Sequence, residues 1–293
     1  MPRYQISHRT FYNYSSPVIQ SNHLLHLEPR QVTHQNVVRH NLIIKPKPAW
    51  RESRPDYFGN PTTLISMEDE HNELLVHSRS EVEVSNAGQP EFMVGEGWER
   101  VAQSLPSMKP DVAEFVCPSR FAAGSKQLYQ FALPSFEPGL PVLEGARRLM
   151  ERIFTDFSFD NTTTDVATPV AQVLAQKSGV CQDFAHLQIA ALRSLGLPAR
   201  YVSGYILTHP VEGEKKLEGT DASHAWVQVW SPEKGWVDFD PTNNLVNSTE
   251  HITTGFGRDF GDVSPISGVL LGGGHHSVGV AVDVKVLPPT PVN

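Results

Sequence analysis

The segment Ser178-Gly-Val-Cys-Gln-Asp-Phe-Ala-His186 places a cysteine at the start of a predicted helix. The apolar residues on one face of this helix are Phe184, Leu187, Ala191 and Leu195. Gly196 and Pro198 provide a stop signal, so the helix is predicted over residues 183–195. Cys181 is therefore expected at, or within one turn of, the helix N-terminus. Unpaired N–H groups and the helix dipole favour negative charge there, which favours the nucleophilic thiolate.

Helices precede this segment and strands follow it. Apolar residues at spacings of 4, 3 and 4 predict a helix over about residues 141–155. A second helix is predicted with Thr168 as N-cap, Pro169 at the first helical position and an end at Gly179. Strands are predicted over residues 200–207, 225–230, 235–240 and 278–286. Helices followed by an antiparallel sheet predict an α+β domain.

Two of these strands are joined by Ser231-Pro-Glu-Lys-Gly235, which has the composition of a turn. If the tryptophans on either side of the turn pair with each other, His224 and Asp240 lie on one face of the hairpin as diagonal neighbours. Such neighbours are about 7 Å apart at Cα, which allows an imidazole–carboxylate hydrogen bond. Asp238 lies one step further toward the turn, so Asp240 is the better candidate partner for His224.

Cys181, His224 and Asp240 together provide the groups of a thiol-based triad. A histidine base takes the thiol proton, and a carboxylate on its other nitrogen fixes the tautomer and stabilises the imidazolium. Backbone N–H groups at the helix start, including that of Cys181, could stabilise a developing oxyanion. We predict that Cys181 is the nucleophile, His224 the general base and acid, and Asp240 the orienting residue.

Other reactive or aromatic residues are interpreted as structural. Cys117 is interpreted as a core residue, because cysteine is among the most buried residue types. His186 lies five positions after the candidate nucleophile and on another side of the helix, so it is interpreted as a core or interface histidine. Trp226 and Trp236 are expected to pack rather than to bind substrate. The loop residues Arg258, Asp259 and Asp262 fit a charged support network and a solvated loop equally well.

Strand periodicity dominates the first hundred residues. Alternation runs from Tyr4 to Tyr14 and again from Val38 to Ile44, with turn residues between later strands. Residues 1–106 are therefore predicted to form an all-β, sandwich-like domain. Residues 107–140, which are rich in Pro, Gly and Ser, are interpreted as a linker, and residues 141–293 as the catalytic core.

The composition narrows the classes of function. The chain has 24 basic and 32 acidic residues, a formal charge of −8 and no block of Lys and Arg suited to nucleic acid. No apolar run approaches the ~20 residues that span a bilayer, and Met1–His8 lacks the apolar region of a signal peptide, so we expect a cytoplasmic protein without a membrane partner. Neither an HExxH pattern nor paired cysteines indicate a metal, and we expect no cofactor.

Four ordered blocks resemble the transglutaminase-like superfamily. They are residues 178–186, 196–205, 224–226 and 235–242. The family's Cys, His and Asp fall on Cys181, His224 and Asp240, and the resemblance implies a cysteine-protease-like α+β core. Residues 257–265, together with the strand-rich N-terminal region, resemble the bacterial branch of the superfamily.

The superfamily includes cross-linking enzymes, peptidases, amidases and inactive relatives, so the triad alone does not select the acceptor. We expect a hydrolytic cysteine peptidase or amidase that acts on a peptide or protein substrate. Two alternatives stay open: a protein-glutamine gamma-glutamyltransferase, and a non-catalytic protein-binding module on the same scaffold. The charged segment between Thr208 and Ser223 is hypothesised to be a mobile lid over the site.

Overall fold

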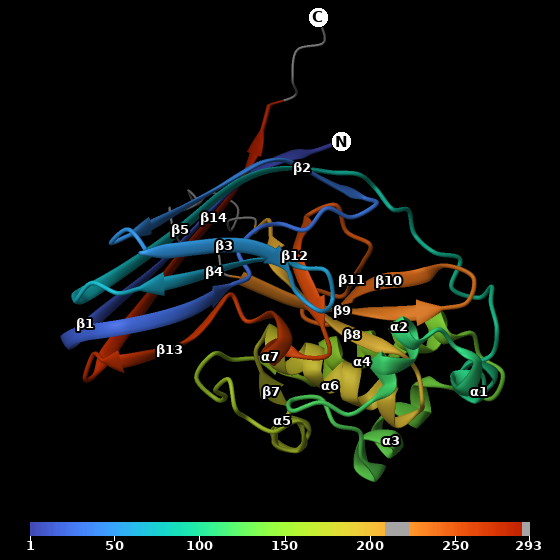
Figure 1. The fold of residues 1–293 in the computed structure, drawn as a ribbon. Coiled ribbons are helices and arrows are strands. Elements are labelled where there is room, and N and C mark those ends of the chain that lie inside the picture. The colour runs from blue at the N-terminus through green and yellow to red at the C-terminus, as the bar shows by residue number, and fades with distance from the viewer. Residues whose placement is uncertain (209–222, 289–293) are drawn as a thin grey trace, which may run out of the picture.

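A computed structural model describes residues 1–208 and 223–288 of the chain. These residues form two antiparallel sheets, and the helices gather on the side of the second sheet that faces away from the first (Figure 1). The predicted α+β architecture is confirmed, because helices and an antiparallel sheet follow a strand-rich N-terminal region. No helix within the described ranges is long and apolar enough to cross a bilayer.

The first sheet contains seven strands of the described chain. They are β1 (Arg3–Leu25), β2 (Gln35–Lys45), β3 (Trp50–Pro55), β4 (Pro61–Met67), β5 (His71–Val84), β13 (Ile266–Gly272) and β14 (His276–Leu287). β1 joins two halves of this sheet, because its first part pairs with β5 and β14 and its last part with β4 and β13. The halves share a buried cluster that includes Leu42, Ile65 and Val76, which gives the region its sandwich-like character.

The second sheet has the strand order β11-β10-β9-β8-β12 in the described residues. Its strands are β8 (Ala199–Ile206), β9 (Ser223–Ser231), β10 (Gly235–Asp240), β11 (Leu245–Val246) and β12 (His251–Gly257). The main helices are α4 (Val142–Asp156), α5 (Val170–Gln176) and α6 (Cys181–Ser194). α6 packs against β8 and β9 and is buried along almost its whole length, as expected for a helix at the centre of a core.

Short elements complete the fold. They are α1 (Trp98–Gln103), α2 (Pro110–Ala113), α3 (Lys126–Ala132), α7 (Phe260–Val263), the 3-10 turns η1 (Leu105–Ser107), η2 (Glu114–Val116) and η3 (Leu133–Ser135), and the paired strands β6 (Ser158–Phe159) and β7 (Ser178–Gly179). The predicted helices exist with small shifts at their ends. α5 begins at Val170, with Pro169 rather than Thr168 in the N-cap position, and α6 begins at Cys181 itself.

The region between residues 107 and 140 packs as part of the core, which differs from the predicted linker. Leu128, Ala132 and Phe136 are buried in the same cluster as α4 and α6. From α6, the buried guanidinium of Arg193 donates hydrogen bonds to the carbonyls of Phe115 and Ala122. A segment rich in Pro, Gly and Ser lacks helical periodicity, but it can still bury the few large apolar side chains that it contains.

The two last strands belong to the first sheet, so the prediction that all strands after the helices form one sheet is wrong. β14 pairs with β1 from Arg3↔Leu287 to Tyr14↔His276, and β13 pairs with the far end of β1. The predicted catalytic region 141–293 therefore ends with two strands that complete the N-terminal sheet. Alternation identified residues 278–286 as a strand, but alternation carries no information about the partner strand.

Side chains of the N-terminal region pair with the outer edge of β12. The amide of Gln35 donates to the carbonyl of Thr253 at 2.8 Å and accepts from its N–H at 2.8 Å. Asn60 makes the same double contact with Phe256, at 2.8 and 2.9 Å. Both amides are buried. These side chains form hydrogen bonds with backbone N–H and C=O groups of β12, which is the edge strand of the sheet, in the way that a further strand would.

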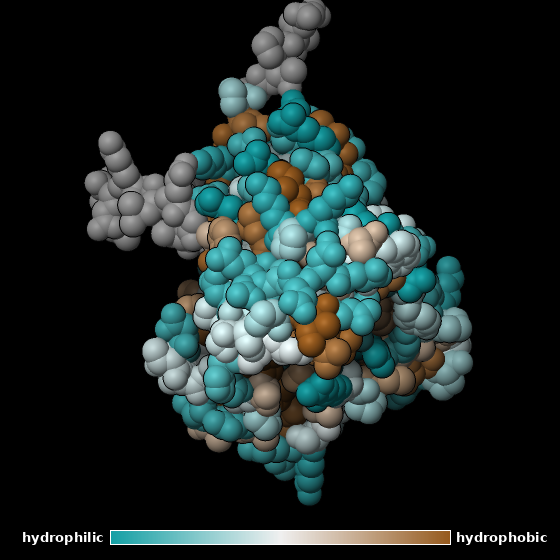
Figure 2. Space-filling view, turned by 60° about the vertical axis from the view of Figure 1, so that its left-hand side comes forward, coloured by the Kyte–Doolittle hydropathy of each residue, from teal (hydrophilic) through white to brown (hydrophobic). Residues whose placement is uncertain are grey.

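Cys117 is exposed, so its interpretation as a core residue is wrong. In η2 the neighbouring Phe115 takes the inward position and is buried. The face of the molecule in Figure 2 is mainly hydrophilic, with hydrophobic residues in smaller groups.

Candidate active site

Cys181 is the first residue of α6, and its side chain is half-buried. Val180 precedes it in an extended conformation, and the N–H of Val180 donates to Asp183 Oδ2 at 2.8 Å. Thr164 donates to the same oxygen at 2.7 Å. A Cβ on Gly179 would lie 2.7 Å from this oxygen, so the turn before the cysteine requires glycine. The Gly-Val-Cys-Gln-Asp sequence thus fixes the helix start at the cysteine.

His224 lies on β9, and its buried ring faces Asp240 at the end of β10. His224 Nε2 is 2.8 Å from Asp240 Oδ2. The predicted register is confirmed, because Trp236 pairs with Trp230. The hairpin therefore brings together the two residues that the sequence selected.

Asp240 is almost fully buried and accepts hydrogen bonds from five donors among the described residues. Oδ2 accepts from His224 Nε2, from Asn243 Nδ2 at 2.8 Å and from His251 Nε2 at 2.9 Å. Oδ1 accepts from the N–H groups of Thr242 at 2.9 Å and Asn243 at 3.2 Å. So many donors favour the ionised carboxylate, and the Asp-Pro-Thr-Asn sequence supplies three of them.

The protonation states follow from these contacts. Burial alone would raise the pKa of Asp240, but hydrogen bonds from His224 and His251 hold it well below its ordinary value. Burial opposes protonation of His224, but hydrogen bonds to Asp240 and Cys181 raise its pKa above the ordinary value of 6.5. Since an ionised carboxylate only accepts, His224 Nε2 carries a proton, and Nδ1 is the ring nitrogen available to the thiol. Cys181, His224 and Asp240 therefore form one line of contacts.

The sequence did not identify His251 as a site residue. It begins β12, is buried, and donates from Nε2 to the same carboxylate oxygen as His224. Its Nδ1 is buried without a hydrogen-bond partner among the described residues. His251 also packs on Trp226, with ring centroids 4.7 Å apart. No local pattern marks this histidine, because β8 lies between β9 and β12 in the sheet.

Asp238 has a different partner, as predicted. Its Oδ1 accepts from Trp226 Nε1 at 2.8 Å. Trp226 is buried and stacks on His224 at 6.1 Å between ring centroids, so it packs as expected. Trp236 also packs, between Phe115 and the guanidinium of Arg200.

His186 is a core histidine, as interpreted. It stacks on Phe121, and its Nε2 accepts from the N–H of Phe260 at 3.1 Å. Burial lowers its pKa to about 4, so it stays neutral. For Arg258, Asp259 and Asp262 the structure supports each alternative in part. Asp259 is buried, caps α7 and accepts from the N–H of Phe121, so it supports the local fold. Arg258 pairs with Asp262 at 2.9 Å in an exposed position, as in a solvated loop.

One group in the described residues has the donor atoms of a metal site. Side-chain nitrogen and oxygen atoms of His224, Asp240 and His251 lie within 4.8 Å of one another. Both histidine nitrogens already point at Asp240 Oδ2 at hydrogen-bond lengths, which satisfies them without an ion. The hypothesised lid between Thr208 and Ser223 lies outside the described residues.

A cysteine at a helix start and a His–Asp pair on the facing sheet provide the groups of a thiol-based triad. Residues 131–241 match the model of the transglutaminase-like superfamily, and residues 4–83 match that of the bacterial transglutaminase-like N-terminal region. The chain belongs to the transglutaminase-like superfamily.

The chain is also similar to individual proteins. An uncharacterised protein of Mycobacterium tuberculosis is 37% identical over 292 residues, which cover 98% of this chain and 93% of that protein. The solved structure of a proposed cysteine protease from Cytophaga hutchinsonii has the same fold, with a TM-score of 0.76 and 20% identity over 99% of this chain and 92% of that one. A protein-glutamine gamma-glutamyltransferase of Pseudomonas aeruginosa is 41% identical over 68 residues, or 22% of this chain and 10% of that protein.

Proposed function

We propose that the protein is a thiol-dependent acyl-transfer enzyme that acts on amide bonds of peptides or proteins, and that water is its main acceptor. The observation that carries this proposal is the continuous contact from Asp240 through His224 to Cys181 at the start of α6. A core cysteine would need neither a buried ion pair beside it nor a helix N-terminus.

The chemistry follows from these positions. His224 takes the proton of the Cys181 thiol, and the sulfur attacks the carbonyl carbon, so that a C–S bond forms and the carbonyl oxygen becomes negative. The N–H of Cys181 has no acceptor within its own helix and can donate to this oxyanion. The C–N bond then breaks, and His224 gives its proton to the leaving amine. Water attacks the thioester while His224 takes a proton from it, the C–S bond breaks, an acid is released, and His224 returns the proton to the sulfur.

Transfer to an amine is the second candidate. The P. aeruginosa relative is named as a glutamyltransferase, and its match lies in a short segment. In that reaction a primary amine, rather than water, attacks the thioester, while every earlier step is the same. Hydrolysis and transfer therefore differ only in the molecule that attacks the thioester, and the triad residues do not indicate which of the two occurs.

A partition experiment tests this ranking. The protein is incubated with a glutamine-containing peptide and a labelled primary amine, and mass spectrometry compares backbone cleavage, deamidation and amine incorporation. We expect hydrolysis products to exceed amine incorporation in the native protein. Cys181→Ala is expected to abolish both, while Cys117→Ala, which removes the exposed cysteine, is the matched control. Amine incorporation above hydrolysis would make the protein a transferase, and equal products from both variants would favour a non-catalytic scaffold.

A further inference from the structure

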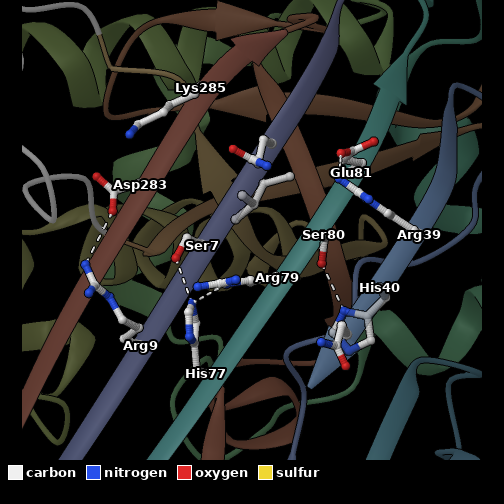
Figure 3. Close-up of a pocket in the computed structure, with 13 residues that line it drawn as sticks. Ser7, Arg9, Arg39, His40, His77, Arg79, Ser80, Glu81, Asp283 and Lys285 are labelled. Atoms are coloured by element: carbon white, nitrogen blue, oxygen red, sulfur yellow. Dashed lines mark hydrogen bonds and ion pairs between the residues drawn. The ribbon is translucent and has the colours of Figure 1, made fainter. Parts of the chain in front are cut away.

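A polar pocket of about 500 Å³ lies on the first sheet, on the face that points away from the catalytic core. Along β1, Tyr4 and His8 point inward and contact Thr249 and Tyr205 of the core region. Ser7 and Arg9 alternate with them and so point outward. Figure 3 shows the pocket side chains projecting from four neighbouring strands, β14, β1, β5 and β2.

The pocket collects positive charge on a chain whose net charge is −8. Arg9, Arg39, Arg79 and Lys285 line it, against the two acids Glu81 and Asp283. Glu81 is neutralised, because one of its oxygens binds Arg3 at 2.6 Å and the other binds Arg39. These contacts hold the pKa of Glu81 below its ordinary value despite burial. Glu81 therefore does not compensate the other cations.

Arg79 is a cation of the pocket that is not paired with Glu81 and can therefore bind an anionic ligand. No carboxylate of the described residues lies within 4.0 Å of its guanidinium, and its side chain is exposed to the pocket. Its Nε donates to His77 Nε2 at 3.3 Å, and Ser7 Oγ lies 2.9 Å from the same nitrogen. Burial, Arg79 and Arg9 lower the pKa of His77, so this buried ring stays neutral and acts as a hydrogen-bond acceptor. It orients Arg79 without neutralising it.

Arg9 is held loosely. Its guanidinium is 3.8 Å from Asp283, which is longer than a hydrogen bond. An oriented guanidinium with a free edge binds planar carboxylate or tetrahedral phosphate through two parallel hydrogen bonds. The neighbouring Gln5, Asn41 and Ser80 add neutral hydrogen-bonding groups, and Ile6 is the apolar residue among the pocket lining described.

We propose that this pocket is a second binding site, separate from the thiol centre, for a small hydrophilic molecule that carries a carboxylate or phosphate group. Arg79, oriented by His77, binds the oxyanion, and Arg9 completes the positive side of the pocket. The volume is within the range of small-molecule sites, about 300–1,000 Å³, and the polar lining excludes an apolar ligand.

Calorimetric titration of the full chain tests the proposal, with citrate and inorganic phosphate as separate probes at constant ionic strength. We expect at least one probe to bind with a Kd below about 10 mM, and the better probe assigns the carboxylate or phosphate source. Arg79→Gln is expected to weaken that binding about tenfold or more. Arg100→Gln removes the same charge from an exposed position in α1 and is expected to leave binding unchanged.

Circular dichroism and thermal melting establish that both variants are folded. The proposal would be overturned if neither citrate nor phosphate binds. Equal affinities of the Arg79→Gln and Arg100→Gln variants would overturn it as well, because binding would then reflect general charge rather than this pocket.

Discussion

At the scale of single residues, the site depends on a carboxylate that is buried, ionised and surrounded by donors. Asp240, whose own pKa is lowered, stabilises the protonated ring of His224, whose pKa is raised. The raised pKa of His224 contributes to the free energy of unfolding at low pH, and this contribution is lost as pH rises through the raised pKa. The lowered pKa of Asp240 contributes to the free energy of unfolding above the ordinary pKa of an aspartate, and this contribution is lost only as pH falls through the lowered pKa.

Replacement of Asp240 tests this electrostatic role. Asp240→Asn removes the charge that raises the pKa of His224, so the imidazolium loses its proton at lower pH. We expect kcat/KM to fall by roughly 10²–10⁴-fold and the alkaline limb of its pH profile to move to lower pH. The measurement is kcat/KM from pH 5 to 10, with Asp238→Asn as the neighbouring carboxylate control. An unchanged alkaline limb in Asp240→Asn would show that Asp240 does not set the charge of His224.

His251 is expected to act as a positioning residue through Asp240. Its Nε2 donates to the carboxylate at 2.9 Å, and the amide nitrogen of a glutamine can replace this donor, whereas that of the shorter asparagine cannot reach as far. We predict about a tenfold loss of kcat in His251→Asn and substantial recovery in His251→Gln, with KM little changed in both. Equal losses in the two variants would assign His251 to packing alone.

Cys181, His224 and Asp240 could be predicted from the sequence because two of them lie in one hairpin, whose register follows from its turn, and the third starts a recognisable helix. His251 could not be predicted in this way. It lies on β12, which pairs with β8, whereas Asp240 lies on β10, on the other side of β9 from β8, and the sequence does not reveal this strand order. The burial of Phe115, which leaves Cys117 exposed, likewise depends on tertiary packing rather than on residue type.

At the scale of elements, β12 connects the N-terminal region to the candidate site. Gln35 and Asn60 satisfy its outer backbone groups, and His251 stands at its start. Alternation and turn residues predicted most strands in both regions. They could not predict that β13 and β14 pair with β1, because a strand pattern does not specify its partner.

The Gln35 contact should contribute measurably to stability. Gln35→Ala leaves the N–H and the carbonyl of Thr253 without this partner in a buried position, so we expect a loss of about 1–3 kcal/mol in the free energy of unfolding. Urea denaturation measures it, and Gln31→Ala, which changes an exposed glutamine in the connection before β2, is the control. If Gln35→Ala lowers the free energy of unfolding no more than Gln31→Ala does, water must replace the Gln35 side chain as the partner of Thr253.

At the scale of the whole molecule, the two sheets behave as parts of one structure. Tyr205 and Ile252 of the second sheet share a buried cluster with residues of β1, β5 and β14. The segment between residues 107 and 140 is fastened to α6 by Arg193, which donates to Phe115, Ser119, Ala122, Ala199 and Arg258. The core built on the second sheet and the N-terminal region are therefore expected to unfold together.

Arg193→Met tests this cooperation. The change keeps an apolar stem but leaves several buried carbonyls without a donor, so we expect a loss of about 3–5 kcal/mol. Far-UV circular dichroism and tryptophan fluorescence should report one coincident, shifted transition during urea denaturation. Arg100→Met, at an exposed position of α1, serves as the control. Two separate transitions in the variant would contradict a single cooperative unit.

The central claim, that Cys181 is an activated nucleophile, is tested most directly by its rate of alkylation. Iodoacetamide is added at pH 7, and peptide mass spectrometry follows Cys181 and Cys117 in the same sample. Exposure alone favours the exposed Cys117 over the half-buried Cys181. We predict the opposite order, with Cys181 at least about tenfold faster and slowed to the rate of Cys117 or below in His224→Ala. A Cys181 that reacts no faster than Cys117, and that is insensitive to His224, would contradict the account.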